Sequence, residues 1–212
     1  MTERPSDHRA ALEPESRRAF VDPHESAVRE AVDAIRRGDR TAFARLVQLY
    51  ERRLFSLSVM MTRDRSGAEE VTQDAFVRAF VHLDAYDERR PFYSWLATIA
   101  VRLAQNWLTR RTRISRREGS QLRPDFDAAS ATVDPLSELI ADESDRRLWQ
   151  TVARLPYGER TTVILYYRQE MTVRDIARAM GVTGGTVKTM LFRARHRLRH
   201  TVRDTRSGKE RT

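Results

Sequence analysis

The chain has 212 residues, no cysteine, a formal net charge of +9 and a sequence pI of about 10.6. The lack of cysteine excludes disulfides, thiol catalysis and cysteine-ligated zinc, and the basic balance favours a polyanionic partner such as nucleic acid. No apolar run reaches the roughly 20 residues of a membrane helix, and residues 1–24 hold no apolar signal-peptide core, so we expect a cytoplasmic protein without membrane insertion.

A first helical domain is predicted over residues 26–111, after a disordered N-terminal tail at residues 1–25 that carries three prolines among mixed charges. Apolar residues recur at helical spacing, and Asp39 or Thr41 is expected to cap the second helix. A turn is expected at residues 62–67 and a charged loop at residues 84–91. The predicted helices cover residues 26–37, 42–61, 68–83 and 92–111.

A linker is predicted over residues 112–143, where the helical periodicity fades and the charge changes from basic to acidic. A short helix is expected within the linker near Pro135. The acidic half of the linker either mimics nucleic acid or only provides solubility. A second helical domain follows at residues 144–203, with a C-terminal tail at 204–212. The expected fold class is therefore all-α, with two small helical domains joined by a flexible linker.

The second domain ends in a predicted helix-turn-helix within Thr172–Arg199. Gly181 is expected in the turn, and the Thr183 hydroxyl is expected to cap the last helix. Gly184 and Gly185 would let backbone come close to a DNA phosphate. A helix with solvated arginines is the alternative, but the segment from Gly184 to Arg203 interleaves no acid among its basic residues, which favours DNA. The side chains expected to reach DNA are Lys188, Thr189, Phe192 and Arg193.

The last helix of the first domain offers a polar side opposite its apolar face. Aromatic residues beside basic ones stack unpaired bases in single-strand binders, and Tyr93 lies on this polar side. Trp95 and Trp107 fit core packing better than base stacking. The residues expected to be exposed on the polar side are Tyr93, Thr98, Arg102, Gln105, Asn106 and Arg110.

Two blocks of the chain resemble conserved regions of the sigma-70 family, in its compact ECF (extracytoplasmic function) branch. Region 2 is similar to residues 42–111, which read AFARLVQLYERRLFSLSVMMTRDRSGAEEVTQDAFVRAFVHLDAYDERRPFYSWLATIAVRLAQNWLTRR. Region 4 is similar to residues 155–199, which read LPYGERTTVILYYRQEMTVRDIARAMGVTGGTVKTMLFRARHRLR. The family's domain between regions 2 and 4 has no counterpart here, which indicates the ECF branch.

The resemblance implies an ECF-type sigma factor that binds core RNA polymerase and directs promoter recognition, DNA melting and transcription initiation. It implies no catalytic residue, no cofactor and no metal. The implied partners are the β′ and β subunits of core RNA polymerase, promoter DNA and an anti-sigma factor.

Site residues follow from the matched motif positions. Core-polymerase binding is implied for Glu70, Gln73, Asp74, Phe76 and Phe80, although Glu69 and Glu70 would also complement the dipole of their helix. Contacts with the −10 element, including capture of a flipped base by the loop at residues 84–91, are implied for Asp87, Tyr93, Trp95, Arg102, Gln105, Asn106 and Arg110. Contacts with the −35 element are implied for Thr183, Gly185, Thr186, Lys188, Thr189, Phe192, Arg193 and Arg195.

Two other function classes remain open. A stand-alone helix-turn-helix regulator would bind duplex operators without polymerase. A metal-dependent nuclease would need a carboxylate cluster such as Glu69, Glu70 and Asp74, but no two-metal pattern supports it. His196 and His200 are spaced for a metal, yet no third ligand lies near them in sequence.

Overall fold

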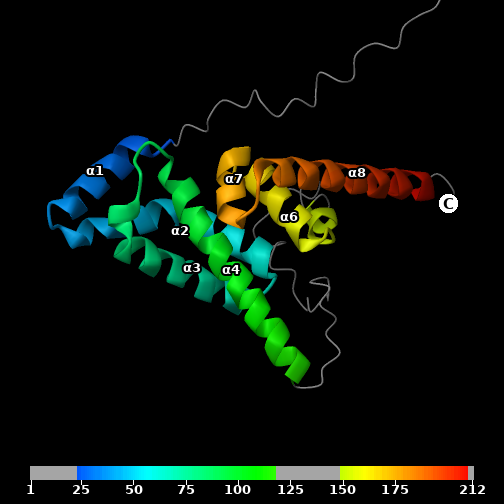
Figure 1. Cartoon of the computed structure of the whole chain (residues 1–212), viewed down its shortest axis with the longest axis horizontal. Helices are drawn as coiled ribbons and strands as arrows, with labels where there is room; N and C mark the ends of the chain where they lie inside the picture. Colours follow the sequence, from blue (N-terminus) through cyan, green and yellow to red (C-terminus); the bar gives the residue numbers. More distant parts are fainter. Residues whose placement is uncertain (1–22, 118–148, 210–212) are drawn as a thin grey trace, which may run out of the picture.

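The computed structural model describes residues 23–117 and 149–209, with side chains described for residues 23–114 and 149–199. Every regular element in these ranges is helical, which confirms the expected all-α class (Figure 1). The elements are α1 (Glu25–Arg36), η2 (Arg40–Ala42), α2 (Phe43–Thr62), α3 (Arg65–Val81), η3 (Leu83–Ala85), α4 (Phe92–Arg117), α6 (Tyr157–Val163), η4 (Ile164–Arg168), α7 (Val173–Met180) and α8 (Gly184–Lys209). The helix expected near Pro135 lies outside the described residues.

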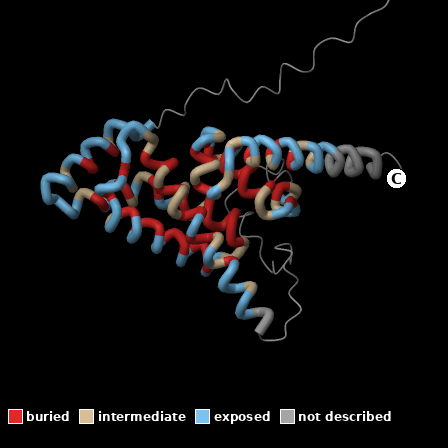
Figure 2. The backbone as a smooth tube through the Cα atoms, viewed as in Figure 1, coloured by how far each residue is buried: buried red, intermediate tan, exposed pale blue. Residues whose placement is uncertain are grey.

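The N-terminal bundle, which we define as α1–α4, is built on pairwise packing of α2, α3 and α4. Each of these helices turns its apolar residues inward, as the red interior of the tube shows (Figure 2). Leu54 of α2, Ala75 of α3 and Leu96 of α4 are all fully buried. Burial of such side chains stabilises a bundle by roughly 1.5–3 kcal/mol for each large residue. No helix in the described part of the chain is both long enough and apolar enough to cross a membrane.

The connection between α2 and α3 is shorter than the expected turn at residues 62–67. Arg63 ends α2 in the left-handed conformation, with φ of 55°, and Asp64 is the N-cap of α3. The Asp64 carboxylate accepts a hydrogen bond from the Gly67 backbone N–H at 2.7 Å. The predicted turn is too long because Asp64 caps α3, which begins at Arg65.

Gly67 lies where α3 meets α4 at very close range. A Cβ atom at this position would lie 2.3 Å from Cζ2 of Trp107, so only glycine allows the indole to rest on the backbone of α3. The α4 helix itself continues to Arg117, past the end expected at Arg111, so the first residues assigned to the linker are helical.

The C-terminal unit, which we define as residues 149–209, forms a helix-turn-helix. Thr172 caps α7 by accepting a hydrogen bond from the Asp175 N–H at 3.1 Å. Gly181 ends α7 in the left-handed conformation, with φ of 68°, and lies in the turn expected there. Thr183 then accepts a hydrogen bond from the Thr186 N–H at 3.2 Å, which confirms its predicted role as the cap of α8.

The two parts of the chain lie in contact. Helix α7 packs against α4, and Figure 1 shows these helices side by side. Between α6 and α7 the chain forms the π-helical turn η4. Helical turns of this kind often lie at functional sites. This turn places Tyr167 and Gln169 at two different surfaces, described below.

Candidate nucleic-acid interface

Helix α8 presents one exposed face and one buried face. Val187, Leu191 and Ala194 are at most 1% exposed and hold the helix against α6 and α7. Since a helical turn takes 3.6 residues, their neighbours emerge on the opposite side. The exposed side chains there are Lys188, Thr189, Phe192 and Arg193. The structure therefore brings together the four side chains that the sequence reading placed on DNA.

Phe192 is the most exposed of the large apolar side chains in the described residues, at 68%. A single exposed apolar side chain is ordinary on a protein surface, so what matters here is that the ring lies among basic side chains. In a major groove, the methyl group of thymine offers an apolar contact. The exposed face of α8 thus combines apolar and cationic groups in the manner expected of a duplex reader.

The two glycines at the start of α8 have no steric role within the chain. A Cβ on Gly184 would meet only Val173 at 3.7 Å, and one on Gly185 only Thr183 at 3.8 Å. Both are ordinary van der Waals distances. The described fold would therefore accept alanine at either position. Thr186 is half-buried beside the Thr183 cap.

Arg195 is held by a tyrosine of the π turn. Its Nε donates to the Tyr167 hydroxyl at 2.7 Å, and its guanidinium lies 5.6 Å from the centre of the Tyr167 ring. Tyr167 is itself 41% exposed. The arginine is therefore fixed in direction at the edge of the exposed face of α8.

The polar side of α4 is covered at its start and exposed further along. Tyr93 is 1% exposed, and its hydroxyl donates to Gln169 Oε1 at 2.7 Å. Burial raises the pKa of Tyr93, and the Arg53 guanidinium beside it offsets only part of that effect. The expectation that Tyr93 is exposed is wrong, because the C-terminal unit lies on top of it.

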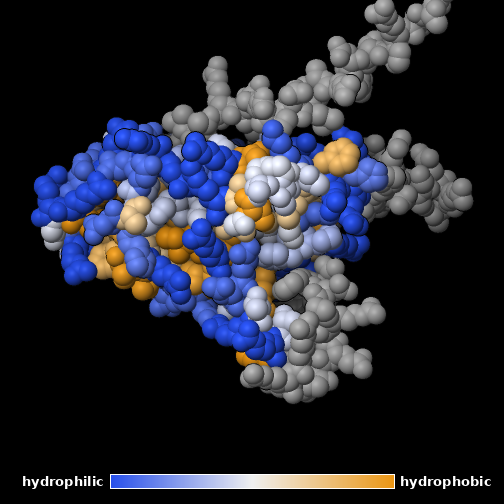
Figure 3. Space-filling view, viewed as in Figure 1, coloured by the Kyte–Doolittle hydropathy of each residue, from blue (hydrophilic) through white to orange (hydrophobic). Residues whose placement is uncertain are grey.

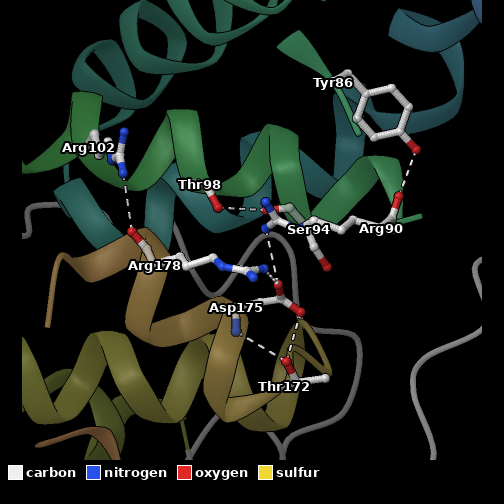
Figure 4. A network of polar contacts seen from close by, with 8 residues as sticks. All are labelled: Tyr86, Arg90, Ser94, Thr98, Arg102, Thr172, Asp175 and Arg178. Atoms are coloured by element: carbon white, nitrogen blue, oxygen red, sulfur yellow. Dashed lines mark hydrogen bonds and ion pairs between the residues drawn. The ribbon is translucent and has the colours of Figure 1, made fainter. Parts of the chain in front are cut away.

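Two further polar residues of α4 also meet the C-terminal unit. Arg102 donates from Nη2 to the carbonyl oxygen of Arg178 at 3.3 Å (Figure 4). Gln105 is half-buried beside Tyr157, and burial raises the pKa of Tyr157 to about 12. Asn106 and Arg110, further along α4, remain exposed.

The loop between η3 and α4 is braced by aromatic packing. Trp95 is half-buried, with its ring centre 5.3 Å from that of Tyr86 and 5.6 Å from that of Phe92. The Tyr86 hydroxyl donates to the Arg90 carbonyl at 2.7 Å (Figure 4). Trp95 therefore supports the loop by packing on the aromatic rings at its two ends. Asp87 is exposed at its tip and accepts a hydrogen bond from the Arg89 N–H at 3.0 Å.

A second exposed surface follows α3. Five side chains share the side of the helix that faces away from the bundle, and apolar groups reach the surface over α3 in Figure 3. We call this set the α3 face: Glu70, Gln73, Asp74, Val77 and Val81. Val77 is 56% and Val81 64% exposed. The sequence reading missed both valines. Their position opposite the buried Val71 and Ala75 was the available signal.

The two phenylalanines that the resemblance assigns to polymerase binding face the bundle. Phe76 is buried at 7% exposure, and its ring meets Phe43 edge-on at 6.5 Å between centres. Phe80 is half-buried, 5.1 Å from the same ring. Both pack in the core and on its rim, so neither side chain belongs to the α3 face.

Glu70 bonds within the bundle as well as lying on the α3 face. Its carboxylate accepts a hydrogen bond from Trp107 Nε1 at 3.0 Å and pairs with Arg110. Glu70 thereby ties α3 to α4, and Arg110 is engaged by the same carboxylate. Within the described residues, no group of three His, Asp or Glu side chains is arranged to hold a metal ion.

Two family models match the chain, and they cover the two parts just described. Sigma-70 region 2 matches residues 46–114, and Sigma-70, region 4 matches residues 145–198. Together they span more than half of the sequence. The first match contains α3 and all but the last residues of α4, and the second contains the turn of the helix-turn-helix and most of its last helix.

The chain is similar to sigma factors over most of their length. The ECF RNA polymerase sigma factor SigW of Bacillus subtilis is 29% identical over 196 residues, covering 85% of this chain and 99% of SigW. The RNA polymerase sigma-H factor of Pseudomonas aeruginosa is 32% identical over 173 residues, covering 78% and 89%. The ECF sigma-E factor of Escherichia coli K12 is 29% identical over 171 residues, covering 77% and 88%.

Solved structures share the fold. The structure of CnrH in complex with the cytosolic domain of CnrY aligns with a TM-score of 0.57 and 23% identity, covering 86% of this chain and 99% of that one. The sigma factor RpoE in complex with the anti-sigma factor NepR, from Bartonella quintana, aligns with a TM-score of 0.55 and 19% identity, covering 76% and 96%.

The chain belongs to the sigma-70 family, in its ECF branch. It is an RNA polymerase sigma factor: it binds RNA polymerase and directs transcription initiation, and it is not an enzyme. The N-terminal bundle holds region 2, and the C-terminal unit holds region 4.

Proposed function

We propose that this sigma factor divides promoter recognition among three surfaces. The exposed face of α8 binds the −35 duplex, the polar side of α4 with its preceding loop binds the −10 element, and the α3 face docks on the polymerase β′ subunit. The factor acts in the cytoplasm, on polymerase made there. The single observation that carries the proposal is the clean separation of exposed and buried side chains on α8.

The −35 surface is supported by chemistry and by geometry. Lys188 and Arg193 can donate to base edges or phosphates, Phe192 can meet a thymine methyl, and Thr183 and Gly185 lie at the positive end of the helix. Helix-turn-helix proteins place the start of their second helix in the major groove. Arg195 would add a phosphate contact directed by Tyr167.

The −10 surface is supported by the loop and α4. Asp87 is exposed at the loop tip, where a flipped base would arrive, and Trp95 braces the loop from below. Asn106 and Arg110 extend an exposed polar track along α4. Base flipping costs a few kcal/mol of stacking, which contacts in this loop would recover. Tyr93, Arg102 and Gln105 would contribute once the C-terminal unit leaves them.

The assignment of the α3 face to polymerase is supported by its combination of polar and apolar side chains. Asp74 and Gln73 offer polar groups, while Val77 and Val81 offer exposed apolar area on the same side of α3. Interfaces join an apolar centre to a polar rim in this way. We assign the β′ coiled coil to the α3 face, because this face lies within the Sigma-70 region 2 match.

An anti-sigma factor is the remaining proposed partner. It is supported by the fold shared with CnrH bound to CnrY and with RpoE bound to NepR. The α3 face would be blocked by such a partner whenever polymerase must be excluded.

Transcription from a promoter library with purified core RNA polymerase tests these assignments. The parent chain should give run-off products, and Arg193→Ala should lose discrimination at one −35 position at a cost of about 1–3 kcal/mol. Arg154→Ala is the matched control, because Arg154 is exposed in the C-terminal unit and precedes α6, so it is not part of α8. Unchanged −35 preference in Arg193→Ala would remove α8 from the proposed role.

A gel shift separates this function from that of a stand-alone regulator. The free chain should bind promoter duplex weakly, and core polymerase should convert that binding into initiation. Tight sequence-specific binding by the free chain, with no transcription gained on adding core, would favour the regulator.

A further inference from the structure

A cavity of about 340 Å³, which we call the arginine cavity, lies where α2 of region 2 meets the π turn of region 4. Its volume falls within the range of small-molecule sites, roughly 300–1,000 Å³. Arg53 joins the two sides, since its Nε donates to Gln169 Oε1 at 3.1 Å and its Nη2 donates to the Gln169 carbonyl at 3.0 Å. The lining residues are Arg52, Arg53, Phe55, Ser56, Arg168 and Gln169.

The described wall of the arginine cavity carries three guanidinium groups and no carboxylate. The acids next to it in sequence, Glu51 and Glu170, are exposed and are not among the lining residues. Like charges gathered in one place repel one another, and an anion between them removes that repulsion. The planar fork of arginine also matches the oxygens of a phosphate group. The charge of the cavity therefore favours a ligand that carries phosphate.

Three side chains of the wall have polar groups available to a ligand. Arg52 is exposed and forms no hydrogen bond or ion pair with another described residue. The Arg168 guanidinium lies over the Trp149 ring, 5.8 Å from its centre, and a contact through the flat face leaves the N–H groups at its edge for phosphate oxygens. The Ser56 hydroxyl is buried, and within the described part of the chain it has no hydrogen-bond partner. Buried polar groups are seldom left unpaired, so this hydroxyl is a further group for a ligand to satisfy.

Phe55 adds an apolar surface to the same wall. The ring is half-buried, and the Arg65 guanidinium lies 5.9 Å from its centre. Nucleotide bases stack on aromatic side chains of this kind. The cavity therefore offers cationic contacts for phosphates and an apolar contact for an organic group attached to them.

We propose that the arginine cavity binds a small anion with two linked phosphate groups, either free diphosphate or a diphosphate ester. Arg52 and Arg168 hold the phosphates, and the Ser56 hydroxyl donates to one of their oxygens. Arg53 keeps its bonds to Gln169 and adds positive potential. The lining residues belong to none of the three surfaces assigned above to DNA and polymerase. The sigma factor thus has a separate site for a soluble phosphorylated metabolite.

Calorimetric titration of the full chain with inorganic diphosphate, in buffer without divalent metal ions, tests the site. The parent should bind at a single site, and Arg52→Ala should weaken binding about tenfold, because a hydrogen bond between charged groups is lost. Arg154→Ala is the matched control: it also removes one exposed positive charge, but Arg154 does not line the cavity, so affinity should stay unchanged. Absence of binding by the parent would overturn the proposal. So would equal losses in the two variants, because general attraction to a basic chain would then explain them.

Ser56→Ala separates recognition from folding. It removes a buried hydroxyl that has no partner within the described residues, so without ligand the variant should melt no lower than the parent. Its affinity for diphosphate should nevertheless fall about fivefold. Diphosphate should raise the melting temperature of the parent and raise that of Arg168→Ala less, since a ligand stabilises the fold in proportion to its occupancy. Parent-like affinity in both Ser56→Ala and Arg168→Ala would overturn the proposal.

Adenosine diphosphate, titrated in the same way, distinguishes the two sources of phosphate. Tighter binding than that of inorganic diphosphate, with the gain lost in Phe55→Leu, would support a nucleotide as the ligand. Equal affinities would support the linked phosphates alone. A parent chain that binds neither probe, and whose affinity for labelled single-stranded DNA falls in Arg52→Ala and Arg168→Ala, would overturn the proposal and assign the two arginines to DNA.

Discussion

Arg195 donates its Nε–H to the hydroxyl of Tyr167, 2.7 Å away, and so joins the proposed DNA-reading helix to the π turn of η4. The bond fixes the direction of a guanidinium that would otherwise sample many rotamers. A charge held in place loses less entropy when it binds a phosphate.

Tyr167→Phe should therefore weaken −35 duplex binding roughly two- to tenfold, since one hydrogen bond contributes about 0.5–1.5 kcal/mol. The salt dependence of binding should stay unchanged because the charge remains. Arg195→Ala should instead reduce the slope of log affinity against log salt by about 0.9. Anisotropy titrations over a range of salt concentrations separate the two effects. Equal affinities for Tyr167→Phe and the parent would show that the tyrosine does not position the arginine.

Val77→Ser with Val81→Ser should weaken binding to core polymerase without lowering the melting temperature, because both side chains are exposed. Ile114→Ser is the control, since Ile114 is 49% exposed on α4 and outside the α3 face. Immobilised core polymerase gives the affinities. Full binding by the double variant would remove the α3 face from docking.

Phe76→Ala should act on the fold instead. Truncating a buried phenylalanine costs about 3–5 kcal/mol, so this variant should melt earlier whatever its effect on polymerase. Denaturant unfolding measures the difference. A Phe76→Ala chain that unfolds like the parent would contradict the packing of its ring on Phe43.

Gly185→Ala should separate folding from DNA binding. The new methyl group would meet only ordinary contacts, and alanine favours a helix over glycine by about 0.5–1 kcal/mol, so thermal stability should rise slightly. Duplex affinity should fall if the backbone here approaches a phosphate. A variant that gains stability and keeps its affinity would show that the phosphate lies elsewhere.

Asp64→Ala should lower the free energy of unfolding by about 1–2 kcal/mol through loss of the α3 cap. Burial acts to raise the pKa of Asp64, but the Gly67 N–H and Arg111 outweigh it, so the pKa lies below its usual 3.8. A lowered folded pKa means that the stabilisation is complete above about pH 3.8 and is lost as the pH falls through the folded value. Denaturant melts from pH 7 to pH 2 should show the parent and the variant converging only in acid. Convergence near neutral pH would contradict the assignment.

The helices and the helix-turn-helix could be predicted because their determinants are local. Apolar spacing, the Thr183 cap and the left-handed Gly181 all act within a few residues of where they lie. The same holds for the exposed face of α8, which follows from helical period alone.

What the sequence could not supply depends on distant contacts. Tyr93 was expected at the surface, and only the fold reveals Gln169 covering it from far along the chain. Phe76 fits a docking motif by position, yet its ring packs inside the bundle. Val77 and Val81 are different, because their position opposite the buried Val71 and Ala75 could be predicted from helical period.

The contact of Gly67 with the Trp107 indole has a mechanical consequence. It sets how far α3, the proposed polymerase-docking helix, lies from α4, the proposed −10 helix, with no side chain in between to adjust that spacing. Enlarging Gly67 would therefore shift the alignment of melted DNA relative to the enzyme that copies it. The transcription start site would then change, although every residue proposed to contact polymerase or DNA is intact.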